Sequence, residues 1–383
     1  MKKEKLRYGM VGGGTGAFIG AVHRKAIALN ENASLVAACF SENEERNVST
    51  GKRFEIAEER IYKNYKEMAE KEAKRKDKID FVSIVTPNAL HYKIAMAFLD
   101  AGIHVACEKP LCLTLEEAED LQRKAREKKL CVCVTYTYTG YPMVKLAREL
   151  IQQGEIGEIV NINAEYFQEW LMDELYLHKS SGKTLSLWRT DPQKAGTSNC
   201  VGDIGSHIEA TVSYITGLYP KRISAVLDHY GADLDLNANI LVEFSNGAHG
   251  VFCCSQVCAG HQNDLVIRIF GTKGAIEWIQ ERPEFLKVAR KDKPIQKYDR
   301  GTGYITGKAA ELNHLPAGHP EGIILAFSNI YQSFCDALLE IKNRKKILKE
   351  EKDFPDLNDG IRGVKFIHAA VESKKNDSKW VAL

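Results

Sequence analysis

The chain has 383 residues, with 53 Lys and Arg against 51 Asp and Glu, and a formal net charge of +2 at pH 7. This length fits two domains of ordinary size, and the near-neutral charge excludes the basic surface of a generic nucleic-acid binder. No apolar run reaches the roughly 18 residues of a membrane span, and the opening MKKEKLRYGMVGGG lacks the apolar stretch of a secretory signal. We therefore expect a soluble cytoplasmic protein that binds neither nucleic acid nor membrane.

The ten cysteines mostly lie inside apolar runs such as VAACF and LCVCVTY, where a free thiol behaves as a small buried hydrophobe. No Cys-x-x-Cys pair occurs. The closest spacings, Cys131 with Cys133 and Cys254 with Cys258, lack a second pair at a zinc-site interval. We therefore predict neither a metal site nor a disulfide framework.

The first third of the chain alternates short β-rich runs with amphipathic helical stretches. The predicted strands are LRYGMVG, SLVAACF, IDFVSIVT, IHVACEK and LCVCVTYTY, and HYKIAMAFLDAG is a predicted helix ending at Gly102. The stretch TLEEAEDLQRKAREKK begins with a capping box, Thr114 followed three residues later by Glu117. Near-continuous apolar strands that alternate with helices indicate a parallel sheet covered by helices on both faces. Residues 1–135 are therefore predicted to form one α/β domain.

From about residue 155 the pattern changes to successive strands joined by tight turns. The runs are IVNINAEYFQEW, RISAVLDHY, NANILVEFSNGAHGVFCCSQVC, DLVIRIFGTKGAIEWI and FLKVARKD, and Asn246-Gly247 is a hairpin signal. Helical stretches return from about residue 323. Residues 136–383 are predicted to form an α+β domain on a large open, mostly antiparallel sheet. Because such a sheet leaves one face uncovered and a second subunit usually covers it, we expect a homo-oligomer.

Glycines cluster directly after the first predicted strand, in LRYGMVGGGTGAFIG. Gly12 and Gly14 allow a tight turn in which backbone N–H groups approach a pyrophosphate at a helix N-terminus, and Ala17 takes the last position of the G-x-G-x-x-G/A motif. The strand before the glycines and the helix after them provide the structural context that the motif needs. We therefore predict a dinucleotide site that includes Gly12, Gly14, Gly16, Phe18 and Ile19.

The residues at the end of the second predicted strand do not decide which group contacts the adenosine ribose. NAD usually meets a carboxylate at this point, but the chain has Phe40, Ser41 and Glu42 here. Either Glu42 holds the ribose hydroxyls, or Ser41 with Arg46 accommodates the 2′-phosphate of NADP. NAD is the expected cofactor, and NADP stays the alternative.

The next segment is TPNALHYKIAMAFLDAGIHVACEKP. Together with the glycine loop and a D-x-x-x-H at 203–207, it resembles the glucose–fructose oxidoreductase / inositol dehydrogenase family (Gfo/Idh/MocA). The resemblance covers nearly the whole chain, although the stretch GAFIG departs from the commonest loop of the family. It implies an N-terminal Rossmann domain, a C-terminal α/β domain with a large open sheet, a nicotinamide cofactor, and oxidation or reduction of a sugar or polyol hydroxyl. It also implies cofactor contacts from Thr86, Pro87, Asn88, His91, Glu108 and Lys109.

The same resemblance places the catalytic residues at Lys109, Asp203 and His207. Removal of a hydride from a secondary alcohol requires a base for the hydroxyl proton, and an imidazole exchanges protons near neutral pH. We predict that His207 exchanges this proton, that Lys109 polarises the same oxygen, and that Asp203 orients the substrate hydroxyls, while the nicotinamide carries the hydride. A helical segment would put Asp203 and His207 on one face.

Substrate residues are expected in LWRTDPQKAGTSNCVGDIGSH and LNHLPAGHPEGI. A sugar has an apolar C–H face and a rim of hydroxyls, so aromatic rings beside polar groups suit it. The predicted substrate-binding residues are Tyr136, Trp188, Arg189, Asn199, Asp203, His207 and His319. The W-R-x-D-P and A-G-H-P-E-G runs resemble the branch of the family that oxidises glucosides at the C3 hydroxyl, which includes enzymes that initiate C-glycoside deglycosylation. This resemblance implies a 3-oxo-glycoside product.

Two other functions compete with this reading. An inositol dehydrogenase shares the chemistry and differs only in its pocket. A non-catalytic dinucleotide-binding regulator keeps the fold, but it has no need for Lys109, Asp203 and His207 together. The predicted function is therefore an NAD(P)-dependent dehydrogenase that acts on a sugar or glycoside hydroxyl.

Overall fold

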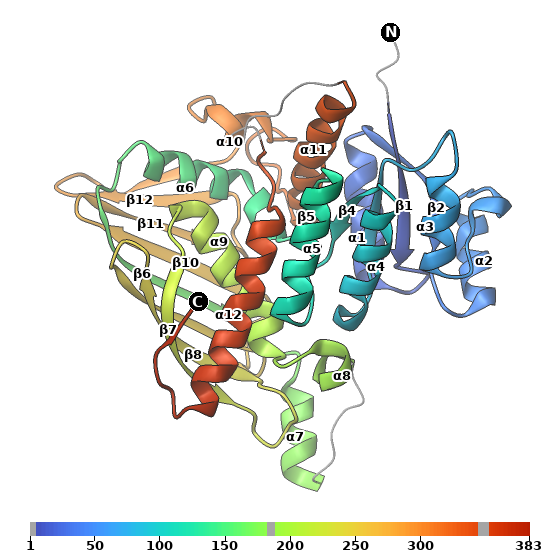
Figure 1. The fold of residues 1–383 in the computed structure, drawn as a ribbon. Helices are drawn as coiled ribbons and strands as arrows, with labels where there is room; N and C mark the ends of the chain where they lie inside the picture. The colour runs from blue at the N-terminus through green and yellow to red at the C-terminus, as the bar shows by residue number, and fades with distance from the viewer. Residues whose placement is uncertain (1–4, 182–187, 344–351) are drawn as a thin grey trace. The chain divides into compact units, whose positions relative to one another are not determined.

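The computed structural model describes residues 5–181, 188–343 and 352–383. The chain divides into two compact units (Figure 1). The first unit contains Met1–Thr137 and Ile323–Ile361, and the second contains Tyr138–Gly322 and Arg362–Leu383. The chain first passes from one unit to the other between Thr137 and Tyr138, two residues after the boundary expected between 135 and 136. The helical tail, however, returns to the first unit before it ends in the second, which the sequence analysis did not anticipate.

The first unit is a parallel sheet with helices on both faces, as the strand–helix alternation predicts. Its described strands have the order β2-β1-β3-β4-β5 and pair in parallel. The strands are β1 (Leu6–Gly12), β2 (Ala33–Cys39), β3 (Phe81–Val85), β4 (His104–Cys107) and β5 (Val132–Val134). The helices are α1 (Phe18–Leu29), α2 (Glu44–Arg53), α3 (Tyr65–Ala73), α4 (His91–Asp100), α5 (Leu115–Lys128), α11 (Ile323–Lys342) and the start of α12 (Leu357–Lys375), with short 3₁₀ turns at Glu58–Arg60 and Asn88–Leu90.

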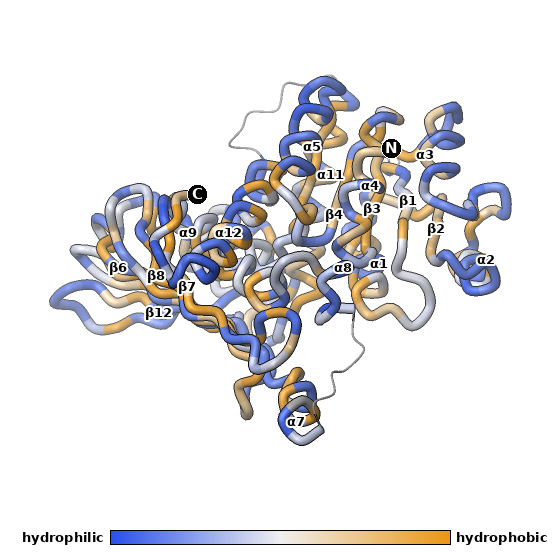
Figure 2. Tube along the Cα trace, turned by 60° about the horizontal axis from the view of Figure 1, so that its bottom comes forward, coloured by the Kyte–Doolittle hydropathy of each residue, from blue (hydrophilic) through white to orange (hydrophobic). Residues whose placement is uncertain are grey.

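Local sequence signals explain where several of these helices begin. The capping box predicted for α5 is present, because Thr114 Oγ1 accepts from Glu117 N at 3.2 Å and Glu117 Oε2 accepts from Thr114 N at 3.3 Å. Asn43 and Asn64 cap α2 and α3 in the same way through their side-chain oxygens. Figure 2 shows α2 in hydrophilic colour, in keeping with its sequence EERNVSTGKR.

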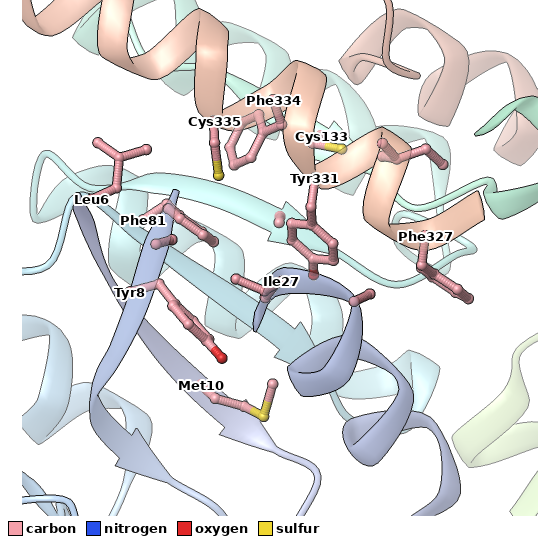
Figure 3. Packing of buried hydrophobic residues seen from close by; sticks show 14 of the residues in the cluster. Leu6, Tyr8, Met10, Ile27, Phe81, Cys133, Phe327, Tyr331, Phe334 and Cys335 are labelled. Carbon is pink, nitrogen blue, oxygen red and sulfur yellow. The ribbon is translucent and has the colours of Figure 1, made fainter. Parts of the chain in front are cut away.

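The helix α11 belongs to the first unit because of its apolar side chains. Phe327, Ile330, Tyr331 and Phe334 recur at helical spacing and are each at most 3% exposed. Figure 3 shows Tyr331, Phe334 and Cys335 of α11 directed toward side chains of β1, β3 and α1. The ring of Phe334 meets the ring of Phe81 edge-on, with the centroids 5.4 Å apart. Burial of this apolar surface holds α11 on the sheet of the first unit.

The second unit is built on a large, mostly antiparallel sheet, which confirms the expected architecture. Its described strands have the order β13-β12-β11-β10-β6-β9-β8-β7-β14, and the pair β6–β9 is parallel. The strands are β6 (Ile159–Phe167), β7 (Pro220–Asp228), β8 (Asn237–Phe244), β9 (His249–Ser255), β10 (Asp264–Gly271), β11 (Gly274–Ile279), β12 (Phe285–Arg290), β13 (Gln296–Asp299) and β14 (Val381–Ala382). The helices are α6 (Pro142–Gln152), α7 (Met172–Ser181), α8 (Pro192–Ala195), α9 (Ser206–Thr216), α10 (Gly307–Glu311) and the rest of α12.

The predicted hairpin at Asn246-Gly247 joins β8 to β9, with Gly247 at φ +86°. The helices α6 and α9 cover one face of the sheet (Figure 1) and pack on β6 and on β10–β12. The buried side chains of β8, such as Ala238 and Ile240, point to this covered face, and they alternate with exposed ones such as Leu241.

Candidate active site

The glycine loop between β1 and α1 has a backbone that only glycine adopts without strain. Gly12, Gly13 and Gly16 have φ values of +82°, +70° and +87°. A Cβ at Gly12 would lie 2.6 Å from Val85 O, and one at Gly20 would lie 2.3 Å from Gly13 Cα. The loop therefore approaches β3 and the first turn of α1 closely, as the sequence motif requires.

This loop fits a dinucleotide pyrophosphate. The N-cap residue of α1, Ala17, makes no side-chain capping bond, so no N-cap side chain occupies the N–H groups of the first turn, as an anion site at a helix N-terminus requires. Phe18 is 76% exposed, and Ile19 is partly buried in the core of the unit. A groove of about 840 Å³ begins beside residues 15–18 and continues along α1 and β2 to Phe54, so it adjoins the loop but is not lined by Gly12 or Gly14. Gly12, Gly14, Gly16, Phe18 and Ile19 are thus brought together at one helix end.

The segment after β2 places Arg46 over the glycine loop. Arg46 Nε donates to Thr15 O at 3.0 Å, and its Nη2 donates to the same oxygen. Ser41 Oγ accepts from Asn43 N at 3.2 Å, and Glu42 is exposed. Arg46 therefore ties α2 to the loop, and both candidates for the ribose contact, Glu42 and the pair of Ser41 and Arg46, lie at this edge.

The hydrogen bonds from Arg46 to Thr15 O lead to a prediction for Arg46→Ala. Because a hydrogen bond from a charged donor contributes on the order of 1 kcal/mol when it is exposed, we expect the KM for NAD⁺ to rise about fivefold with kcat unchanged. Steady-state kinetics with NAD⁺ and NADP⁺ test this expectation. A loss confined to NADP⁺ would contradict the role in holding the loop and would indicate a contact to the 2′-phosphate.

Glu108, at the end of β4, is the centre of a buried hydrogen-bond network. Its Oε1 lies 2.9 Å from His23 Nε2 and accepts from Thr135 Oγ1 at 2.6 Å, while its Oε2 accepts from Lys109 N at 3.2 Å. His23 Nδ1 in turn lies 2.6 Å from the hydroxyl of Tyr331 on α11. Burial alone raises the pKa of Glu108, but the hydrogen bond and charge of His23, the charge of Lys109 and the Thr135 hydroxyl bring it down to about 2. Glu108 is therefore an ionised anchor for the backbone at Lys109.

His91 fixes the same region from the other side. It is fully buried at the start of α4, with Nδ1 2.7 Å from Pro110 O and Nε2 2.9 Å from Thr86 O. Burial lowers the pKa of His91. The ring joins the turn at Thr86, Pro87 and Asn88 to the turn after Lys109. Lys109 itself is half-buried between these two anchors.

In the second unit, Asp203 and His207 lie at the start of a helical segment, which begins with a π-helical turn, Val201–Gly205, before α9. Such turns occur often at functional sites. The ring of His207 meets the ring of Tyr138 at 4.8 Å and that of Tyr166 at 6.4 Å. His207 is 7% exposed.

A wall of aromatic and charged side chains lies beside Asp203. Arg189 Nε is 3.4 Å from Asp203 Oδ2. The guanidinium of Arg189 lies over the ring of Trp188 at 4.5 Å and near that of Trp170 at 5.9 Å. The structure thus brings Trp188, Arg189 and Asp203 together with Trp170.

The remaining predicted substrate residues have different surroundings. Asn199 is buried, and its Nδ2 donates to Gln256 Oε1 at 2.6 Å and to Asp235 O at 3.2 Å. His319 is exposed, and the contacts described for it are made by its backbone, to Arg300 and Pro316. Tyr136 is fully buried at the end of the first unit.

Sequence reasoning chose Tyr136 as the substrate-binding tyrosine, whereas Tyr138 is the tyrosine beside His207. The run VTYTY gives Tyr136 and Tyr138 equal weight, because strand periodicity places them on one face. The chain instead turns into a 3₁₀ helix at Thr137–Gly140, which carries Tyr138 into the second unit. Its hydroxyl is hydrogen-bonded to that of Tyr166 and accepts from Asn263 Nδ2 at 3.1 Å.

Two further observations concern the described part of the chain. No group of three or more His, Cys, Asp or Glu side chains there has the arrangement of a metal site. None of the described helices has the length and apolar content needed to cross a membrane.

The fold and these residues define a class: oxidoreductases with a Rossmann dinucleotide site and a second, sheet-based domain. A family model described as an oxidoreductase family with an NAD-binding Rossmann fold matches residues 6–136, and the model of the Gfo/Idh/MocA C-terminal domain matches residues 144–277. The protein belongs to the Gfo/Idh/MocA oxidoreductase family, and its N-terminal domain is an NAD-binding Rossmann domain. The family resemblance seen in the sequence is thereby confirmed.

Individual relatives agree with this membership. The chain is 36% identical to the uncharacterized oxidoreductase YfiI of Bacillus subtilis, over 99% of this chain and 97% of the relative. An inositol dehydrogenase homolog from Azotobacter vinelandii, solved with NAD⁺, is 34% identical with a TM-score of 0.91, over 99% and 98% of the two chains. A levoglucosan dehydrogenase, solved with NADH and levoglucosan, is 26% identical with a TM-score of 0.83, over 99% of both chains.

Proposed function

We propose that this protein is an NAD-dependent dehydrogenase that moves a hydride between the cofactor and a secondary hydroxyl of a sugar or glycoside. The observation that supports it most directly is that one unit carries a buried imidazole, His207, four residues after Asp203, and that the Asp203 carboxylate lies 3.4 Å from Arg189 in the Trp188–Arg189 wall. The first unit carries the glycine loop and the anchored Lys109. Similar chains were solved with a nicotinamide cofactor and, in one case, with an anhydrosugar.

Each residue then has one task. His207 takes the proton of the reacting hydroxyl during oxidation and returns it during reduction. Lys109 donates a hydrogen bond to the same oxygen, which stabilises the charge that develops on it. Asp203 accepts a hydrogen bond from a substrate hydroxyl and so fixes the ring. NAD, when bound at the glycine loop through Gly12, Gly14 and Gly16, supplies the hydride acceptor.

For the substrate, we favour oxidation at C3 of a glucoside to a 3-oxo-glycoside. The aromatic faces of Trp170 and Trp188 suit the C–H face of a pyranose ring, and Arg189 and Asp203 suit its hydroxyl rim. Inositol dehydrogenation is the second candidate, because a cyclitol is also a six-membered ring with adjacent secondary hydroxyls and the A. vinelandii structure is named as an inositol dehydrogenase homolog.

A substrate panel tests the proposal. Glucosides, free sugars and inositols are incubated with NAD⁺ or NADP⁺, the absorbance of the reduced nicotinamide is followed, and the product is analysed for a ketone at C3. We expect turnover of a glucoside with NAD⁺. Turnover of inositols alone would replace the glucoside by the second candidate, and turnover of none would overturn the proposal.

The open face of the nine-stranded sheet supports the proposal that the enzyme is a homo-oligomer. Val226, Leu241 and Phe270 on this face are 44%, 50% and 37% exposed, and the register of the strands places them on the same side as Arg268. Arg268 pairs with Glu165 and Glu277, each at 3.0 Å. An apolar and charged face of this kind fits a second copy of the chain.

We expect Leu241→Asp to convert the oligomer to a smaller species, because a carboxylate in an apolar interface loses its hydration without gaining a partner. Native mass spectrometry at micromolar concentration checks the masses of both proteins. A wild-type protein that is wholly monomeric at this concentration would contradict the proposed oligomer.

A further inference from the structure

Gln256 directly follows β9 and holds the carboxylate of Asp203. The side chain of Gln256 is fully buried, and its Nε2 donates to Asp203 Oδ2 at 2.9 Å. Nothing in the sequence motif D-x-x-x-H indicates this residue, which is 53 positions further along the chain.

The direction of this hydrogen bond is set by two further groups. Asn199 Nδ2 donates to Gln256 Oε1 at 2.6 Å and to Asp235 O at 3.2 Å. A backbone carbonyl only accepts, so the Asn199 amide must present its NH₂ group on this side. Gln256 must then present its oxygen to Asn199 and its NH₂ group to Asp203. The hydrogen bonds that run from Asp235 through Asn199 and Gln256 to Asp203 therefore have one assignment of donors and acceptors.

Asp235, in the loop between β7 and β8, anchors the start of the series. Its Oδ1 accepts from Asn199 N and its Oδ2 from Val201 N, both at 2.9 Å, and its carbonyl accepts from Cys200 N at 3.0 Å. Asp235 is 1% exposed. The first residues of the π-helical turn are thus fixed to the β7–β8 loop, and the turn continues with Asp203 N donating to Asn199 O at 2.7 Å.

We propose that Gln256, oriented by Asn199 and Asp235, is the positioning residue that keeps Asp203 ionised and in one rotamer for the substrate hydroxyl. This inference rests on the proposed dehydrogenase function. An N–H donor stabilises the charged form of a carboxylate and restricts its rotation. A carboxylate that accepts from Gln256 and forms an ion pair with Arg189 at 3.4 Å is ready to receive a substrate hydroxyl without reorganisation.

The other titratable groups around Asp203 are Arg189, the phenols of Tyr138 and Tyr166, the thiol of Cys200, and His207 on α9. Burial raises the pKa of Tyr138 to about 12 and also raises those of Tyr166 and Cys200. These three groups are therefore neutral between pH 5 and 9, and Arg189 stays charged. The proposed base His207 also acts in this pH range, and burial raises the pKa of Asp235 at the start of the series. Gln256→Met keeps both of these groups and adds no carboxyl group, so the difference between Gln256→Glu and Gln256→Met below pH 6 reports on the carboxylate pair.

The test is Gln256→Glu, which replaces the amide NH₂ by an oxygen. Two carboxyl groups at this separation share one proton. We expect the acid limb of kcat/KM for the sugar to move up by at least one pH unit, while the Kd of NAD⁺ stays unchanged. In Gln256→Met, which has no hydrogen-bonding group of this kind, we expect a loss of about tenfold in kcat/KM at every pH, mainly through KM. The control is Gln152→Glu, which adds the same charge at an exposed position of α6.

A second readout does not need turnover. Because the shared proton raises the pKa of the pair in the folded state only, the unfolding midpoint of Gln256→Glu should fall, relative to Gln152→Glu, as the pH rises from 4 to 8. A pH-independent difference between the two variants, or an unchanged acid limb, would overturn the inference. If the wild type turns over no sugar but the two variants still show this pH-dependent difference in unfolding midpoint, only the proposed function is overturned.

Discussion

Lys109→Met and His207→Ala should each lower kcat by about a thousandfold, while the Kd of NAD⁺ changes by no more than about threefold. The expected size follows from the contribution of a positioned proton-transfer group, which is typically 10²–10⁴-fold. The glycine loop carries most of the expected cofactor contacts and contains neither side chain, so binding should largely persist even though Lys109 is also expected to contact the cofactor. Stopped-flow or steady-state kinetics with saturating substrate give kcat, and fluorescence titration gives the Kd of NAD⁺.

Lys76→Met is a matched control for the first variant, because Lys76 is an exposed lysine between α3 and β3. Turnover near the wild-type level in both Lys109→Met and His207→Ala would refute their assignment as catalytic residues.

Glu108→Gln should remove a large pH-dependent part of the stability of the first unit. The pKa of Glu108 is lowered from 4.5 to about 2 in the folded protein, which corresponds to about 3 kcal/mol of stabilisation when the carboxylate is ionised in both states. Because the folded pKa is the lower one, this stabilisation is present above pH 4.5 and is lost as the pH falls toward 2. We expect urea unfolding at pH 7 to show a loss of about 3 kcal/mol in the variant, and the difference from wild type to shrink as the pH approaches 2.

The same experiment on Glu119→Gln provides the comparison, because Glu119 is exposed on α5. Its stability should follow that of the wild type at each pH. Parallel curves for wild type and Glu108→Gln across this pH range would show that the interaction with His23 and Thr135 does not stabilise the charged form.

Much of the fold and part of the candidate site could be predicted because the relevant signals are local in the sequence. The alternation of apolar strands with amphipathic helices predicts the parallel sheet, and Asn246-Gly247 predicts the hairpin at that point. The capping box at Thr114 and Glu117 predicts the start of α5. The glycine loop is predictable for the same reason, because its backbone conformation depends on residues that are adjacent in the chain.

Other features of the site depend on residues far apart in the sequence. His23 and Glu108 are 85 residues apart, and Asn199 is 57 residues from Gln256. No periodic pattern relates such pairs, because each partner is an ordinary polar residue in its own segment. Their contacts exist only because the sheet order brings the ends of distant strands and helices together.

The sequence by itself therefore determined the family, the types of the two sheets and the residues at which chemistry is expected. Only the tertiary structure decided that α11 packs in the first unit, that Tyr138 contacts His207, and that Gln256 holds Asp203. An apolar helix face indicates that the helix is buried. It does not identify the element on which the helix packs, because the hydrophobic effect has no direction. Hydrogen bonds do have direction, and their partners are chosen only once the chain has folded.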